Sequence, residues 1–167
     1  LLVLASFTTV GCRPAEAPET STPLEAARRA AQEHPDDAET VASWMLAELL
    51  APKGDARRAA EAKANLAKLG EGGAMAALAG AFDHDVHGRF TDAAEQYLVA
   101  LAALSRRPEA DAELLGWFAA HRLVALRRAR RGLWERARPV VEEILRDPGT
   151  LGWRARGALI EWWSEEL

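Results

Sequence analysis

The chain has 167 residues, 28% of them charged, and a formal net charge of −4 at pH 7. This balance argues against the strongly basic surface typical of nucleic-acid-binding domains. The single cysteine, Cys12, excludes an internal disulfide, and no Cys/His spacing indicates a zinc site. We therefore expect no metal and no cofactor. Ala, Leu, Glu and Arg dominate the composition, which favours one helical domain, and the apolar stretch 114–126 is too short to span a bilayer.

Residues 1–10 read LLVLASFTTV, which is typical of the apolar core of an export signal. No Met or basic residue precedes them, so we expect residues 1–11 to be a signal segment whose start is missing. The stretch TVGC at 9–12 resembles the lipobox of bacterial lipoproteins. That resemblance implies a lipid anchor on Cys12 and a place in the cell envelope. Plain secretion and a soluble helix end are the alternatives.

Arg13 follows the cysteine, and the absence of Asp there favours the outer membrane, facing the periplasm, over the inner membrane. Residues 12–22 contain Pro, Ala, Glu, Ser and Thr without apolar periodicity, which predicts a flexible tether. A helical domain is expected over 23–167. Adjacent Trp162 and Trp163 point to different sides of a helix, so both cannot face one core, and they make a poor polar cap for a last helix. We therefore expect the domain to be truncated at its C-terminus.

The pattern from residue 22 onward is helical, with short connections and no strand-like alternation. The stretch TPLE at 22–25 is a capping box with Pro at the first helical position. Pro139 is expected in the first turn of its helix, where backbone N–H groups lack partners. About eight helices are predicted, over 23–34, 37–50, 55–69, 73–84, 91–105, 109–130, 135–146 and 150–166.

Two segments of the predicted helices align without gaps at their centres, GRFTDAAEQYLVAL at 88–101 and GLWERARPVVEEIL at 132–145. Both resemble the second helix of the tetratricopeptide repeat, with Gly for the inter-helix turn and Ala for close helix approach. The resemblance implies an α-solenoid of antiparallel helix pairs that binds a protein or peptide. A generic helical bundle or another kind of α-solenoid is the alternative. The matched packing residues are Gly88, Phe90, Ala93, Tyr97 and Leu101 in the first segment, and Gly132, Trp134, Ala137, Val141 and Leu145 in the second.

The stretch DHDVHG at 83–88 is the one metal-like cluster, but its position at a predicted helix end favours a solvated turn. No catalytic set is visible, so we expect a protein that is not an enzyme. The arginine-rich stretch 121–132 is either a solvated helix face with packed side-chain stems or a site for an anionic partner, with Leu123, Val124 and Leu126 facing inward. Partner-binding residues are expected on the first helix of each pair, at Trp44, Glu48, His84, Trp117, His121, Arg127 and Arg128.

These patterns predict a membrane-anchored, non-catalytic interaction scaffold of the bacterial cell envelope. Its expected partners are a periplasmic protein or peptide and, through the lipid on Cys12, a membrane. Nucleic acid is not an expected partner, and no transmembrane helix is expected in the mature chain. The alternative is the N-terminal repeat region of a larger secreted or envelope enzyme whose catalytic domain lies beyond residue 167.

Overall fold

A computed structural model describes residues 21–70, 73–106, 112–129, 134–147, 149 and 151–164. The expected signal segment, Cys12, most of the expected tether and Gly132 lie outside this part of the chain. Nothing is described of the side chains of residues 127–129, Trp134, Arg136 and Trp162. The predictions for Arg127 and Arg128 therefore fall outside the described side chains.

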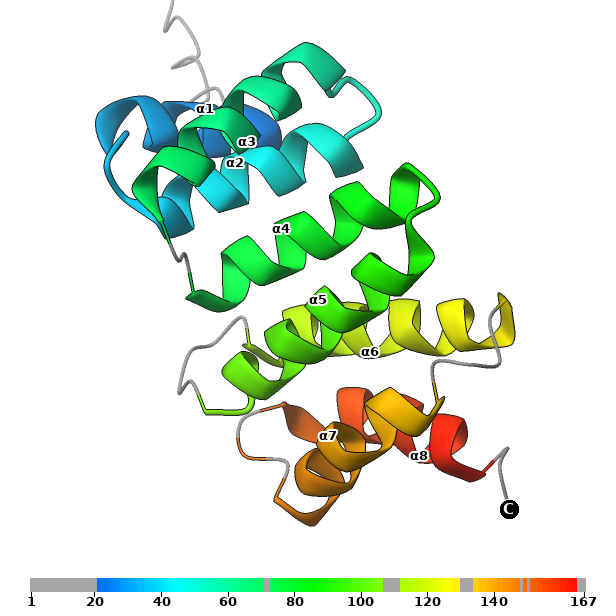
Figure 1. Ribbon diagram of the computed structural model, residues 1–167. Coiled ribbons are helices and arrows are strands. Elements are labelled where there is room, and N and C mark those ends of the chain that lie inside the picture. The colour runs from blue at the N-terminus through cyan, green and yellow to red at the C-terminus, as the bar shows by residue number, and fades with distance from the viewer. Residues whose placement is uncertain are drawn as a thin grey trace, which may run out of the picture.

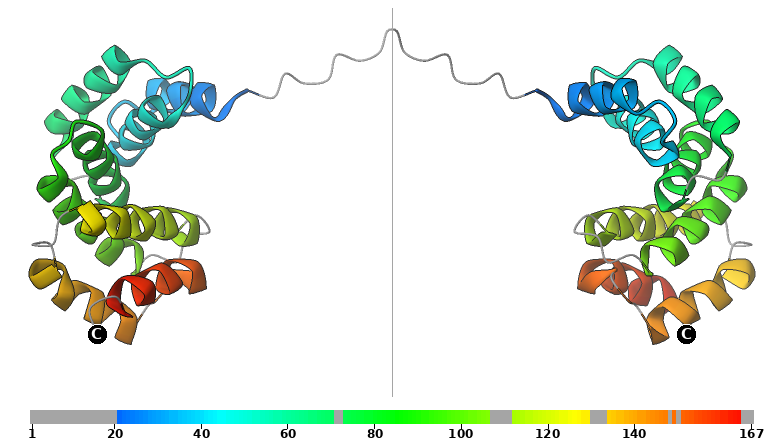
Figure 2. Two further views of the ribbon diagram at one scale, coloured as in Figure 1. Left: turned by 90° about the vertical axis from the view of Figure 1, so that its right-hand side faces the viewer. Right: turned by 90° about the vertical axis from the view of Figure 1, so that its left-hand side faces the viewer.

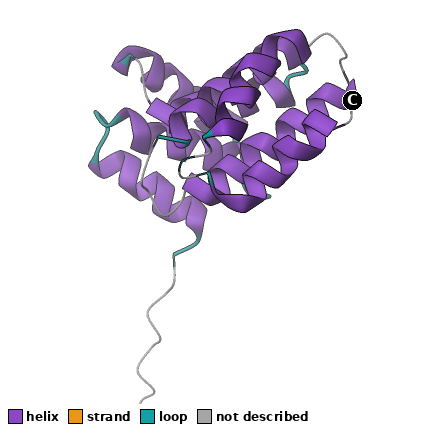
Figure 3. Ribbon diagram, turned by 90° about the horizontal axis from the view of Figure 1, so that it is seen from below, coloured by secondary structure: helices purple, strands orange, loops and turns teal. Residues whose placement is uncertain are grey.

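The described residues form α-helices and no strand, which confirms the predicted all-α class (Figures 1 and 3). None of these helices is long and apolar enough to cross a membrane. The eight helices are α1 (Pro23–Glu33), α2 (Ala38–Leu50), α3 (Ala56–Leu69), α4 (Gly73–Val86), α5 (Phe90–Leu104), α6 (Ala112–Ala129), α7 (Trp134–Arg146) and α8 (Gly152–Ser164).

Local chemistry explains where several helices begin. Thr22 closes the predicted capping box on α1, because its hydroxyl accepts from the Glu25 amide while the Glu25 carboxylate accepts from the Thr22 amide. Asp37 and Asp55 cap α2 and α3 in the same way, by accepting backbone amides of the first turn. Gly88 has φ of 73° in the turn between α4 and α5, a conformation that favours glycine.

One local expectation is wrong. Pro139 lies inside α7 and beyond its first turn, because the helix already begins at Trp134. Proline has no N–H to donate to the carbonyl of Glu135, so this helix lacks one internal hydrogen bond. The exposed position of Pro139 leaves that carbonyl near solvent, which limits the cost.

The helices follow one another along an arc that opens to one side, with α1 and α2 at one end and α8 at the other (Figure 2). The main contacts join helices that are neighbours or next neighbours in sequence. They include α2 with α4, α5 with α7, and α6 with α8. In both views of Figure 2, α6 and α8 lie toward the open side of the arc, whereas α7 lies toward its outer side.

One continuous core of buried residues runs through these helices, and much of it is alanine. Small side chains let helix backbones approach closely, so larger groups fill only a few places in the core. Tyr97 is the largest fully buried side chain, and Leu101 and Leu123 are buried with it. The expected inward positions of Leu123, Val124 and Leu126 are confirmed.

The residues aligned with the tetratricopeptide repeat occupy corresponding places in α5 and α7. Ala93, Tyr97 and Leu101 are fully buried in α5, and Phe90 begins that helix. On α7, Ala137 and Val141 are buried, Leu145 is half-buried, and Trp134 is the first residue. The resemblance to that repeat family remains a prediction.

Candidate functional site

The parallel helices α6 and α8 form the candidate site, and a glycine sets their separation. A Cβ at Gly116 would come within 2.5 Å of Leu151 Cδ2 and 3.7 Å of the Ala155 Cβ, so glycine lets α8 pack here without displacing the Leu151 side chain. Glu113 lies beside Gly152 at one end, and His121 and Glu161 share the groove toward the other. Residue numbers therefore rise together along the interface, which means that the two helices run in the same direction.

A groove of about 390 Å³ lies over this interface, lined by residues of α6 and α8. Small residues of α8 form part of its lining, and adding a Cβ at Gly157 would meet nothing within 4 Å. Two tryptophans and three ionisable side chains complete it. The lining residues are Trp117, His121, Trp153, Arg154, Gly157, Ala158 and Glu161.

Each of the two tryptophan rings of this groove contacts a polar side chain at the surface. Trp117 and His121 are stacked, with ring centroids 5.6 Å apart and planes 14° apart. The Arg154 guanidinium lies 5.5 Å from the centre of the Trp153 ring, a cation–π arrangement. Trp153 is 74% exposed, although an indole is among the side chains that gain most from burial. Such a surface is suited to contact with another molecule.

The structure thus brings two of the predicted binding residues, Trp117 and His121, into one groove. Trp44, Glu48 and His84 lie on α2 and α4, away from it. The prediction missed Trp153 and Arg154, because their helix was expected to be only the truncated end of the domain. One spacing could have indicated the groove: Trp153 and Gly157 are four residues apart in a predicted helix, which places a large ring and a gap on the same helix face.

Glu48 is buried and serves an internal network. Its carboxylate accepts from Arg28 Nε at 2.6 Å and Nη2 at 2.9 Å, from Trp44 Nε1 at 2.9 Å and from the Asp55 amide at 2.9 Å. The Arg28 hydrogen bonds outweigh the opposing effect of burial and lower the pKa of Glu48 to about 2. This one side chain therefore joins α1, α2 and the start of α3.

Asp83 and Asp85 correct the expectation of a solvated turn at 83–88, because both carboxylates are buried on α4. Asp83 accepts from Lys63 Nζ at 2.7 Å and Arg89 Nη2 at 2.8 Å. Burial alone would raise the pKa of Asp83, but Lys63 and the other nearby cations lower it on balance. Helix α4 continues beyond residue 84 because these cations, from α3 and the α4–α5 turn, neutralise the buried charge.

Asp85 joins three helices in a similar way. It accepts from Arg122 on α6, with Nη2 at 2.6 Å and Nε at 2.8 Å, and from the Tyr97 hydroxyl on α5 at 3.2 Å. Burial, together with the charge of Asp85, raises the pKa of the Tyr97 hydroxyl, which stays protonated and donates. One arginine of the basic stretch 121–132 is thus engaged inside the fold.

The two histidines of the stretch 83–88, His84 and His87, have hydrogen-bond partners within the protein. His84 Nδ1 accepts from Arg89 Nε at 2.7 Å, and His87 Nδ1 lies 2.7 Å from the Asp83 carbonyl oxygen. Within the described part of the chain, no group of three His, Cys, Asp or Glu side chains is placed to hold a metal ion.

The groove residues and the buried pairs are therefore separate features, the first open to a partner and the second internal. Comparison with known proteins assigns neither: no family model matches this sequence, and no curated protein or solved structure matches it.

Proposed function

We propose that this chain is a non-catalytic protein-binding scaffold of the bacterial cell envelope, held at the membrane by a lipid on Cys12. The observation that carries the binding role is the groove between α6 and α8, in which Trp153 is 74% exposed beside Trp117. Full burial of a large apolar side chain contributes about 1.5–3 kcal/mol, so a partner that covers both indoles gains substantially. Arg154 and His121 add donors for its polar groups.

The lining also supports a binding role over a catalytic one. Its seven residues include no Ser, Thr, Cys or Lys that would serve as a nucleophile. His121 is stacked on Trp117, which orients the ring as part of an aromatic surface. A polypeptide suits such a surface because its apolar side chains cover the rings while its backbone accepts hydrogen bonds from exposed donors.

The binding role is tested by an aromatic photo-crosslinking amino acid in place of Trp153, which keeps a large ring at that position, in cells that produce the full chain. We expect a discrete adduct with one envelope protein. The same label at exposed Glu61 on α3 is the matched control and should give no such adduct. Adding Gly157→Leu places a side chain in the groove at a position where a Cβ meets nothing within 4 Å, and it should abolish the adduct. An adduct that survives this substitution would contradict the proposed site.

The anchor is supported by the stretch TVGC and is tested separately. Cys12→Ser should move the protein from the membrane fraction to the soluble fraction and leave its helical circular dichroism unchanged. Thr20→Ala in the expected tether is the control and should remain with membranes. A Cys12→Ser protein that still sediments with membranes would rule out the lipid anchor and leave the binding role standing.

A further inference from the structure

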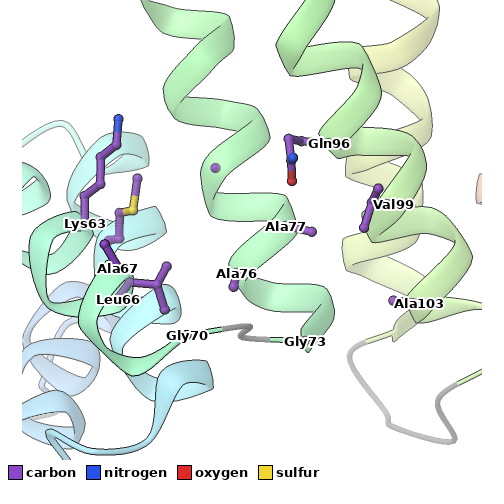
Figure 4. Close-up of a pocket in the computed structure, with 12 residues that line it drawn as sticks. Lys63, Leu66, Ala67, Gly70, Gly73, Ala76, Ala77, Gln96, Val99 and Ala103 are labelled. Carbon is purple, nitrogen blue, oxygen red and sulfur yellow. The ribbon is translucent and has the colours of Figure 1, made fainter.

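A second opening, which we call the trough, lies among α3, α4 and α5 (Figure 4). It has a volume of about 640 Å³ and is open to solvent along one side. Figure 4 shows α4 between α3 and α5, with Leu66 on one side and Val99 on the other. The full lining is Met45, Lys63, Leu66, Ala67, Gly70, Gly73, Ala76, Ala77, Gly80, Gln96, Val99 and Ala103.

The chemistry of the trough excludes most small ligands. Among the described residues that line it, Lys63 and Gln96 alone have polar side chains, so a sugar or nucleotide would find few hydrogen-bonding partners there. The same described lining includes no aromatic ring for stacking. Because one side is open, a single acyl chain lying in it would remain partly in water. An elongated apolar object with a polar outer face fits these conditions better.

The spacing of the helices around the trough suits an added helix. α5 packs against α7, whereas α3 and α5 are not among the main packing pairs. The space between α3 and α5 is therefore where a further helix would find two flanking walls. Small residues on α4 face this space, so a helix can approach closely, at the 8–10 Å or so that separates packed helix axes. Val99 is 54% exposed, and such a helix would cover it.

The charges at one end of the trough indicate which helix fits. Asp83 carries one negative charge but pairs with two cations, Lys63 and Arg89. Asp92 lies 3.8 Å from His84 Nδ1, next to Arg89, and balances the second of these cations. The side chain of Lys63 is 52% exposed and keeps donors free for another acceptor, because an ammonium group has three. An acidic side chain of an incoming helix would be complementary to it.

We propose that the trough binds an amphipathic helix of a partner protein, with an apolar face against α4 and a carboxylate beside Lys63. This surface is distinct from the α6–α8 groove and does not depend on it. The helix takes a position on α3 and α5 like the one that α7 takes on α5. Binding thereby extends the packing of the helices.

The probe is a fluorescent synthetic helix of about 18 residues, with Ala and Leu on one face and Glu along its flanks. We expect saturable binding to the full chain by fluorescence anisotropy. An isomer with Lys in place of the flanking Glu should bind about two- to fivefold more weakly, because its cations face the half-exposed ammonium group of Lys63. Methyl NMR should show shifts at Ala76, Ala77 and Val99.

Gly80→Leu is the blocking variant, because a Cβ there meets nothing within 4 Å and glycine is the weaker helix former. The fold should be retained and probe affinity should fall at least about tenfold. Gly157→Leu is the matched control in the other groove and should bind the probe like wild type. Lys63→Met, which keeps Arg89 on Asp83, should remove the preference for Glu over Lys flanks.

Four results would overturn the proposal. The probe could bind Gly80→Leu as well as wild type, or shift methyl groups around Trp153 and not those of the trough. Sedimentation could show concentration-dependent self-association that Gly80→Leu abolishes, which would make a second copy the occupant. Anionic phospholipid vesicles could bind through the trough, lose binding with Gly80→Leu, and displace the probe. None of these results would affect the α6–α8 crosslink.

Discussion

The trough and the α6–α8 groove are both openings between helices, but their linings differ in a way that decides what each can hold. Glycine and alanine of α4 line the trough, so its surface is nearly featureless. The groove has a smaller volume and is lined by two indoles with charged neighbours. A larger space among small residues admits bulk, such as a helix. A smaller space beside large rings presents ring faces and hydrogen-bond donors for specific contacts.

The buried carboxylates connect the helices that surround the two openings. Asp83 joins α3 to α4 at the edge of the trough, and Asp85 joins α4 and α5 to α6, the helix that carries Trp117 and His121. Each pair spans elements that local sequence contacts alone would not hold together. The helices around one opening are thus connected to those around the other through neutralised charge within the core.

The largest expected effect comes from breaking this connection. Asp85→Ala leaves Arg122 and the Tyr97 hydroxyl without their partner. We expect a loss of about 2–3 kcal/mol in the free energy of unfolding, at or below the low end for a buried pair because Arg122 is about a third exposed. Urea unfolding followed by circular dichroism measures it. Asp85→Asn, which can still accept from Tyr97, should lose less. Equal stability of all three proteins would show that the pair is dispensable.

Gly116 on α6 and Gly157 on α8 allow a tightly packed glycine to be compared with one that has open space beside it. Gly116→Ala brings a Cβ to 2.5 Å from Leu151 Cδ2 and should cost about 1–2 kcal/mol in stability. Gly157→Ala meets no neighbour and should be neutral or stabilising by up to about 1 kcal/mol, since alanine favours helix. Thermal unfolding of the two variants compares them directly. The reverse order would mean that α6 and α8 are not in close contact at Gly116.

A smaller effect is expected from pH at Glu48. Its pKa is about 2 in the folded chain, against an ordinary value of 4.5, so the folded chain holds this proton less tightly than the unfolded chain does. The stabilisation is therefore complete above about pH 4.5 and is lost as pH falls toward about 2. Exposure of Arg28 to solvent screens part of it. The stability difference between wild type and Glu48→Gln should shrink over this window. A difference independent of pH would contradict this assignment.

The smallest effect on stability is expected at the most exposed ring. Trp153→Ala should change the free energy of unfolding by no more than about 0.5 kcal/mol, because the indole covers little of the core. It should nevertheless abolish capture of the groove partner by a crosslinker placed at neighbouring Arg154. Ile160→Ala, at another exposed position of α8, is the control for both measurements. A large loss of stability would mean that the Trp153 side chain packs against the core and is needed for folding.

The features of the site that could be predicted from the sequence are those set by residues close together along the chain. Trp117 and His121 could be proposed from helix position alone, and the structure puts them in one groove. Trp153 escaped notice because its exposure depends on how α8 packs on α6 through Gly116, a contact between residues distant in sequence. Asp83 and Asp85 were assigned to solvent because their cations come from other helices and from the α4–α5 turn. A carboxylate can be buried only where cations lie close to it, and the residues next to it in the sequence do not show which distant cations will do so.

The sequence by itself determined the helices: their number, their bounds to within a few residues, and the capping box at Thr22. These features depend on apolar periodicity, caps and turn residues, all of which act within a few residues along the chain. Tertiary structure alone decided the buried ion pairs, the open trough beside α4, and the exposure of Trp153. Those depend on which helix faces meet, and with a core so rich in alanine many faces are chemically alike until packing distinguishes them.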